Sequence, residues 1–560
     1  MATQWQTFPI EFNGGLISNL SPLQQGSNAV GSATILQNFE ASKLGGYAKL
    51  KGYEKYSTTQ VPGTGPILGL KVISSGRIVA SRKNASNKTE YYYSTGSTWT
   101  SMGESALTNG LKARSALYNL GVSDKVIFVD GVNFPIIYNT AGNTLLKLQN
   151  TDSNADGYTG TNDPLGAEHV VMFKNKAFYS KGNTLFYTVT SSVDDFNTGL
   201  GAGFIGVSAD ITGLAVFRNQ LIIFTTNTVQ SLTGETSSNF KVSPITERIG
   251  CINGDTIQEF GGDIMYLAPD GIRLLSATDR IGDFGLDIAS DKIAKDSIPF
   301  LGSTPIFSSV ILREKGQYRI FAYVESEKTS VSKGLIATKF ISQGGSGVNW
   351  STTKGIKSYI SDSHYTNTEE TVSFANSDGY VYIMETGASF DGEAIEAIYE
   401  SPFMPVTDPQ VRKSFYKMTL YAQPSGNMSL DLNVKYNFAS SSDLTTVQPE
   451  TQQIVGTGTS VFIYGDSESL FASSDRVADN SILVSPAGPW LTYPNQAGPF
   501  YNEVGETFSP ATYGGELDSI YNTNIIGSGK TIAIRIEDNS TNPTFTLDTA
   551  LIEFAQEDRQ

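Results

Sequence analysis

Short apolar and aromatic runs, separated by Gly, Asn, Asp and Ser, follow one another along most of the chain. Runs of this length between turn-forming residues are typical of β-strands. Apolar residues spaced three and four apart persist over three turns almost nowhere, so helices are not expected as main elements. One short helix of about two turns, around 290–296, is predicted as a connector. The pattern therefore predicts an all-β fold.

From residue 66 onward the strands form seven groups, each containing paired apolar runs. Tight turns are expected inside them, because Asn, Asp and Gly tolerate positive φ. These turns are Asp130-Gly131, Asn175-Lys176, Asn219-Gln220, Asp270-Gly271 and Asp378-Gly379. Groups repeating roughly every 40 to 55 residues predict a six- or seven-bladed β-propeller.

The same pattern divides the chain into four parts. An N-terminal arm over 1–60 precedes the propeller blades over 61–438, and 526–560 reads as C-terminal strands that dock back on the body. Between the blades and these C-terminal strands, residues 439–525 are predicted to form an inserted β-rich module. Residues 441–520 hold ten acidic residues and one basic residue, Arg476, among several aromatic residues.

Composition restricts the possible partners. The chain of 560 residues has a formal net charge of -16, and a surface of that sign repels phosphate groups. Tight binding to DNA is therefore not expected, and any DNA that passes this protein should slide past it without sequence-specific binding. The sequence predicts no membrane-spanning segment and no secretory signal at its start, so we expect synthesis and assembly in a host cytoplasm.

The clearest candidate site is a calcium loop. Asp152, Asn154, Asp156 and Asp163 match the oxygen spacing of such a loop. The twelfth position is Asp rather than Glu, and Gly160 occupies the ninth, so an ordinary Asp- and Asn-rich surface loop is the alternative. Apart from this possible calcium ion, no cofactor is expected.

Other motifs favour structural roles. GSGKT, ending at Thr531, resembles part of a phosphate-binding loop, but a strand follows it instead of a helix. STGSTW, ending at Trp99, fits a propeller hairpin. Cys251 is the only cysteine and is expected in the core. His169 and His364 lack the neighbours of a catalytic triad or a zinc site, so no catalytic residue is assigned and no enzyme activity is expected.

One basic cluster lies among aromatic residues. It consists of Arg412, Lys413 and Lys417 in DPQVRKSFYKMTLY. Such residues can contact nucleic acid, but a solvated strand face or a subunit contact is the favoured interpretation.

The order of several segments resembles the nozzle proteins of short-tailed bacteriophages, a family also called tail tubular protein B or packaged-DNA stabilisation protein. The segments in order are FNGGLISNLSPLQ, TVTSSVDDFNTGLGAGFIGV, ITERIGCINGDTIQEFGGDIMYLAPDGIRLL, GASFDGEAIEAIYESPFM and GSGKTIAIRI. The resemblance covers most of the chain except about 441–520.

The resemblance implies a structural virion protein of the viral tail. It would form a hexameric nozzle ring that closes the DNA channel below the portal and adaptor, and would open for genome ejection. The arm over 1–60 would face the adaptor, and tail fibres or spikes would be further partners. Two alternatives stay open: a receptor- or glycan-binding tail propeller using aromatic residues around Trp490–Tyr513, and a virion-associated glycan hydrolase.

Overall fold

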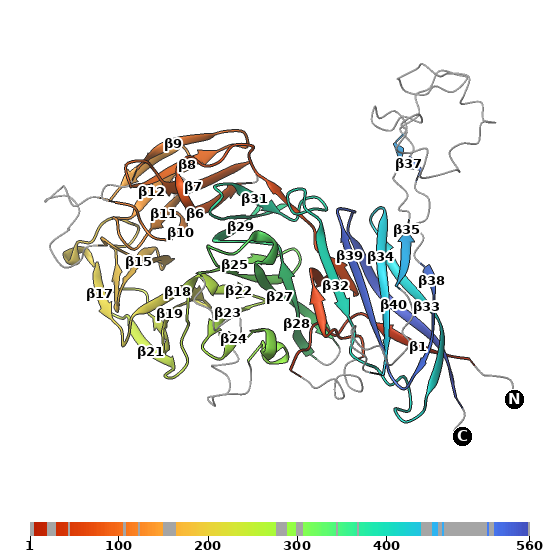
Figure 1. Cartoon of the computed structure of the whole chain (residues 1–560). Coiled ribbons are helices and arrows are strands. Elements are labelled where there is room, and N and C mark those ends of the chain that lie inside the picture. The colour runs from red at the N-terminus through yellow and green to blue at the C-terminus, as the bar shows by residue number, and fades with distance from the viewer. Residues whose placement is uncertain are drawn as a thin grey trace, which may run out of the picture.

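Nearly all regular structure in this protein is β-strand, as the sequence predicted. The computed structural model describes residues 5–19, 30–42, 45–74, 76–104, 108–120, 124–148, 164–275, 288–297, 306–342, 345–366, 369–437, 451–456, 462–463, 512–513 and 520–557. Within these residues no helix is long and apolar enough to cross a membrane. Apart from a two-stranded sheet of β36 (Phe462–Ile463) and β37 (Thr512–Tyr513), the strands form two bodies, a propeller and a sandwich (Figure 1).

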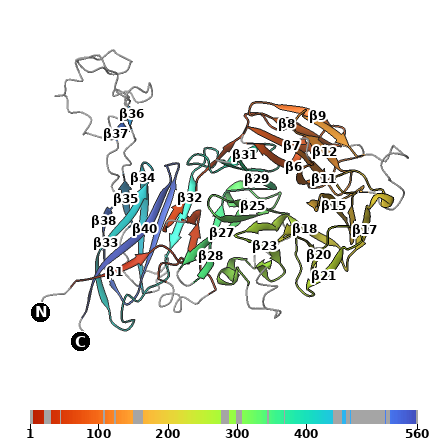
Figure 2. The same cartoon turned by 180° about the vertical axis from the view of Figure 1, so that it is seen from behind.

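The propeller has seven blades, and each predicted strand group falls in one of them (Figure 2). Blades 1 to 4 are antiparallel four-stranded sheets with their strands in chain order. Blade 1 holds β6 (Thr64–Ser74), β7 (Arg77–Lys83), β8 (Thr89–Ser94) and β9 (Trp99–Glu104). Blade 2 holds β10 (Arg114–Asn119), β11 (Asp124–Val129), β12 (Ile136–Asn139) and β13 (Thr144–Lys147). Blade 3 holds β14 (His169–Phe173), β15 (Lys176–Lys181), β16 (Thr184–Tyr187) and β17 (Gly203–Gly206). Blade 4 holds β18 (Ile211–Phe217), β19 (Gln220–Thr225), β20 (Val229–Thr233) and β21 (Lys241–Thr246).

The remaining three blades complete the ring. In the described residues blade 5 has three strands, β22 (Gln258–Phe260), β23 (Asp263–Ala268) and β24 (Gly271–Leu274). Blade 6 has β25 (Ile306–Leu312), β26 (Gln317–Tyr323), β27 (Lys333–Ser342) and β28 (Gly345–Lys354). Blade 7 has β29 (Ile360–Thr366), β30 (Glu369–Ala375) and β31 (Val381–Met384).

A strand from the start of the chain closes the propeller. β5 (Tyr53–Lys55) pairs antiparallel with β31, with Tyr53 opposite Met384. Because β5 immediately precedes blade 1 in the chain, this pairing joins the last blade to the first. The last strand of the predicted 1–60 arm therefore belongs to the propeller.

Three hairpin turns lie one residue earlier than predicted. At the turn expected at Asp270-Gly271, Ala268 pairs with Gly271, so the turn residues are Pro269 and Asp270. Lys174 and Asn175 have φ of 51° and 57°, so they are the central turn residues and Lys176 opens β15. Arg218 and Asn219, with φ of 46° and 65°, do the same before β19. Both central residues of this two-residue turn type need positive φ. The first residue of each of these last two turns is therefore Lys174 or Arg218, where the sequence predicted an Asn.

The sandwich draws strands from both ends of the chain. One sheet has the order β3 (Phe39–Ala41), β4 (Tyr47–Lys49), β40 (Phe545–Gln556), β33 (Lys413–Pro424) and β38 (Ile520–Gly529), and β1 (Gln6–Glu11) also pairs with β40. The facing strands are β2 (Ile35–Gln37), β32 (Ile395–Glu400), β39 (Ile532–Ser540), β34 (Met428–Tyr436) and β35 (Gln452–Gly456). One apolar core fills the space between the sheets and continues to blade 6.

Blade 6 and the second sandwich sheet form one nine-stranded sheet. The junction is β2, which pairs in parallel with β28 through Gln37 and Thr352, and antiparallel with β32 through Ile35 and Glu400. Backbone hydrogen bonds therefore run without a break from the propeller into the sandwich.

A buried ion-pair cluster reinforces this junction. Arg319 of β26 lies 2.9 Å from Glu40 of β3 and 2.7 Å from Glu385, which follows β31. Lys315 pairs with the same two carboxylates. The cluster joins the sandwich to blades 6 and 7 with balanced charge.

The blades end earlier than predicted. The expected propeller range of 61–438 includes β32, β33 and β34, which belong to the sandwich. Their partners β38, β39 and β40 lie beyond residue 519, so only long-range pairing reveals their place. In the connector, a 3-10 turn over Asp291–Ile293 leads into one helical turn at 294–297. Most of the predicted 439–525 module lies outside the described residues.

Candidate functional site at the propeller axis

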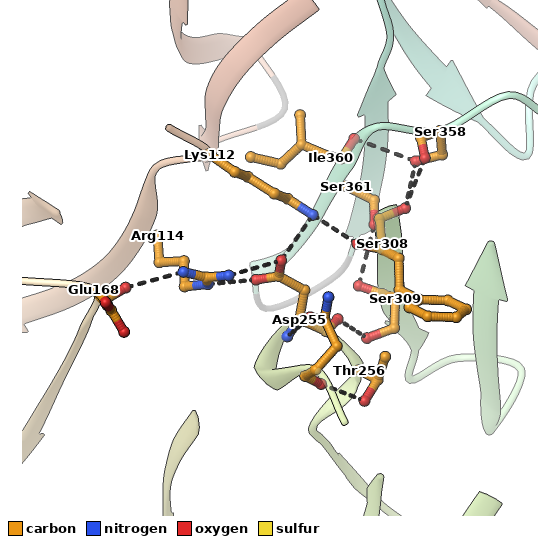
Figure 3. Close-up of polar contacts among 12 residues, drawn as sticks. Lys112, Arg114, Glu168, Asp255, Thr256, Ser308, Ser309, Ser358, Ile360 and Ser361 are labelled. Carbon is orange, nitrogen blue, oxygen red and sulfur yellow. Dashed lines mark hydrogen bonds and ion pairs between the residues drawn. The ribbon is translucent and has the colours of Figure 1, made fainter. Parts of the chain in front are cut away.

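A polar cluster lies where several inner strands of the propeller begin (Figure 3). Its centre is the carboxylate of Asp255, in the 3-10 turn η2 (Gly254–Thr256) that opens blade 5. Arg114, the first residue of β10 in blade 2, places Nε 2.6 Å and Nη2 3.1 Å from the two carboxylate oxygens. Blades 2 and 5 are not neighbours in a seven-membered ring, so this bidentate ion pair spans the axis.

Lys112 brings a second cation to the same carboxylate. Its ammonium lies 3.1 Å from Asp255 Oδ2 and donates a hydrogen bond of 2.8 Å to the carbonyl of Phe307 in β25 of blade 6. It also lies 5.6 Å from the ring centroid of Tyr359. One carboxylate and two cations are thus held together by residues of blades 2, 5 and 6.

Backbone and hydroxyl groups extend the cluster to blades 3 and 7. Arg114 Nη1 donates to the carbonyl of Glu168, just before β14 (Figure 3). Ser309 of β25 donates to the Asp255 carbonyl at 2.6 Å, and Ser361 of β29 donates to the Ser309 carbonyl at 3.1 Å. Five blades therefore meet in one hydrogen-bonded network.

The local backbone explains how Asp255 reaches the axis. Asn253 caps η2, and its side chain accepts a hydrogen bond of 2.8 Å from the Asp255 N–H. Gly254 allows close approach, because a Cβ at that position would lie 2.1 Å from the Thr212 carbonyl oxygen. Only glycine therefore fits between η2 and blade 4.

The charge states of Asp255 and His169 favour a structural role over proton transfer. Burial alone would raise the pKa of the Asp255 carboxyl, but the charges of Lys112 and Arg114 hold that pKa well below its usual range. Burial, together with the nearby charge of Arg114, lowers the pKa of His169 to about 3. At neutral pH Asp255 is therefore ionised and His169 is neutral. Neither group is poised to exchange a proton.

Among the candidate residues that the structure describes, only His169 lies near the axial cluster. Its ring Nδ1 lies 3.0 Å from Ser180 Oγ, in the core of blade 3. His364 lies on β29. Cys251 is fully buried among apolar residues, as predicted, and burial raises the pKa of its thiol to about 12.

The basic cluster is divided by the fold. The Lys413 ammonium is buried and donates to the carbonyls of Pro405 and Lys530, so it has a structural role. Arg412 is exposed and contacts Ser528 and Glu557. The GSGKT segment is the end of β38 and a turn into β39, so no helix follows it.

The calcium-loop candidates Asp152, Asn154, Asp156 and Asp163 all lie outside the described residues. Among the residues that are described, no three His, Cys, Asp or Glu side chains group together in a way suited to a metal ion. The axial cluster itself escaped sequence analysis, because Arg114 and Asp255 are 141 residues apart. The only available signal was a charged residue immediately before an apolar strand.

Comparisons with known proteins give distant likenesses in fold. No protein-family model matches the chain, and no curated protein matches it. One similar solved structure is PorZ, a bacterial surface component of the type-IX secretion system of Porphyromonas gingivalis, with 11% identity, 63% of this chain and 43% of that chain covered, and a TM-score of 0.34. Another is the extracellular domain of a hybrid two-component system from B. thetaiotaomicron, with 11% identity, 61% and 45% coverage, and a TM-score of 0.36. The match spans less than half the length of each of these proteins.

Proposed function

We propose that this chain is the structural subunit of a short phage tail that forms the nozzle ring, closing the DNA channel until the genome is ejected. The observation that carries the proposal is the nine-stranded sheet that continues blade 6 into the sandwich. A subunit that retains packaged DNA must keep its shape under force, and an unbroken hydrogen-bonded sheet resists deformation between its two bodies.

The axial cluster supports a structural role. In a ligand site, a few polar groups point into a cavity and stay available for the ligand. Here the carboxylate of Asp255 and the cations of Lys112 and Arg114 bond to one another. The cluster therefore ties the blades together across the axis.

The net charge and the resemblance in sequence support the same proposal. A net charge of -16 keeps the subunit from adhering to a passing polyanion. The motif order from FNGGLISNLSPLQ to GSGKTIAIRI resembles the nozzle family. Two of its middle segments, TVTSSVDDFNTGLGAGFIGV and ITERIGCINGDTIQEFGGDIMYLAPDGIRLL, contribute strands to blade 3 and blade 5 in the same order. In this account, the adaptor and the tail fibres or spikes are the partners of the ring.

Localisation in the particle tests the proposal. A gold-labelled antibody against this chain, applied to parent virions, should mark the distal axis of a short tail in electron micrographs. Label on peripheral fibres or spikes would instead support receptor binding or glycan hydrolysis. Absence of the label both from intact particles and from particles opened by mild disruption would contradict the assignment altogether.

A further inference from the structure

The outermost strands of the propeller blades differ in how their free edges are protected. Unpaired strand edges invite pairing with other chains, and proteins usually block them with charges, proline, bulges or covering segments. β21 contains Lys241 and Pro244, β13 contains Lys147, and β9 has a bulge at Met102. The edge of blade 6 is covered, because β2 pairs with β28.

β17, the rim of blade 3, has none of these devices among the described residues. Its register with β16 has no bulge, and no described strand pairs with its outer side. No residue between Asp195 and Asp210 is charged. Two large apolar side chains project from this stretch, Leu200 at 63% exposure and Phe204 at 59%. Exposed apolar surface on an open edge is characteristic of a contact site.

A second uncharged edge lies in the sandwich. Among the strands that the structure describes, β38 is the last of its sheet and pairs only with β33. No residue between Asp518 and Lys530 is charged. Ile520 and Ile526 of this strand are 53% and 65% exposed.

The two edges lie at opposite ends of the molecule. β17 is at the side of the propeller farthest from the sandwich, and β38 is at the outer side of the sandwich (Figures 1 and 2). A closed ring of identical subunits needs a head-to-tail contact between two different surfaces. Copies that each carry a charge of -16 repel one another, so an uncharged contact favours their approach.

We infer that β17 of one copy docks against β38 of the next copy, and that this contact builds the ring. The inference rests on the proposed function, because it assumes that copies assemble head to tail. Phe204 and Ile526 are the anchors of the two surfaces.

Cross-linking in assembled particles tests the contact. Phage particles would be produced with the double variant Phe204→Cys/Ile526→Cys, treated with a short bismaleimide and separated on a denaturing gel. We expect a ladder of covalent multimers, because every contact in the ring would carry one cysteine from each side. Native Cys251 is fully buried, so wild-type particles should give monomer only.

The single variants decide the orientation. Phe204→Cys alone and Ile526→Cys alone should both remain monomeric. Cross-linked dimers from Phe204→Cys alone would overturn the inference in favour of a contact between two β17 strands. Monomer only from the double variant, and also from a second pair, Leu200→Cys/Ile520→Cys, in particles that contain the chain, would overturn it outright. Particles that lack the chain would count against the nozzle function itself.

A charge placed on the edge gives an independent measurement. Phe204→Lys should reduce incorporation of the chain into particles at least tenfold, as judged by immunoblot against the purified soluble protein. Leu146→Lys is the matched control, because Leu146 is 54% exposed on the rim of blade 2, where Lys147 already blocks the edge. Equal incorporation of both variants would contradict the proposed contact.

Discussion

The Lys71 ammonium and the Asp362 carboxylate form an ion pair of 2.9 Å across the seam where the propeller ring closes. Lys71 lies on β6 of blade 1 and Asp362 on β29 of blade 7. The second carboxylate oxygen accepts a hydrogen bond of 2.7 Å from the Val72 N–H. One side chain of the last blade therefore holds the inner strand of the first, while β5 closes the outer side.

Replacing Asp362 should weaken this seam. Asp362→Ala leaves the Val72 N–H and the Lys71 ammonium without their partner, which should lower the free energy of unfolding by about 1–3 kcal/mol. Urea denaturation followed by tryptophan fluorescence would measure it. Asp263→Ala is the control, since Asp263 pairs at 3.5 Å with a largely exposed Arg218 and should cost less than about 1 kcal/mol. Equal losses in the two variants would rule out a special role for the seam.

A substitution in the axial cluster should lower the free energy of unfolding more than a substitution at the seam. Asp255→Asn removes the charge that Lys112 and Arg114 share, leaving two partly buried cations beside each other. Removing one partner of a buried ion pair typically costs about 3–5 kcal/mol. The same urea titration would measure the loss. A stability unchanged within about 1 kcal/mol would show that the cluster does not hold the blades together.

His169 should make the protein less stable in mild acid. Its pKa is about 3 in the folded protein against 6.5 for an ordinary histidine, so between these values the unfolded chain binds one more proton. Stability from this group is complete above pH 6.5 and falls by about 1.4 kcal/mol per pH unit below it. Between pH 7 and pH 5, His169→Gln should therefore lose about 2 kcal/mol less stability than the wild type.

The matched control is His364→Gln. The pKa of His364 is also lowered, by burial and by the charge of Lys71, but this side chain is partly exposed. Its replacement should change the pH dependence less than that of His169. Identical pH profiles for His169→Gln and the wild type would contradict the burial of a neutral imidazole.

The buried ion-pair cluster at the junction should stabilise the attachment of the sandwich to the propeller. Arg319→Met removes a buried cation from between Glu40 and Glu385, and should cost about 3–5 kcal/mol. Hydrogen exchange should increase in β3 and β31, which carry or precede these carboxylates. Arg313→Met is the control, because the exposed guanidinium of Arg313 lies 3.5 Å from the buried carboxylate of Glu370 and takes no part in the junction cluster; it should leave exchange in both strands unchanged.

The blades could be predicted from the sequence because each is built from strands that follow one another in the chain. Each blade consists of consecutive strands, so apolar runs separated by turn-forming residues reveal it without knowledge of distant partners. β5 and β33 were assigned to the wrong body, because their partners lie more than a hundred residues away. An apolar strand shows which face is buried but not which strand covers it.

The axial site could not be predicted for the same reason. Lys112, Arg114 and Asp255 each look like an ordinary charged residue beside a strand, and only the closed ring brings them together. By contrast, the core position of Cys251 followed from its apolar neighbours alone. Local composition thus predicted burial correctly, while contacts across the ring required the fold.

The central claim is that this chain closes the DNA channel of a phage tail, and retention of DNA tests it most directly. Particles would be produced from a phage that cannot express the chain, and DNase-sensitive DNA would be measured against wild-type particles. The account predicts that the deficient particles lose their packaged DNA, and that purified chain added before the loss prevents it. Deficient particles that keep their DNA as well as the wild type would contradict the account.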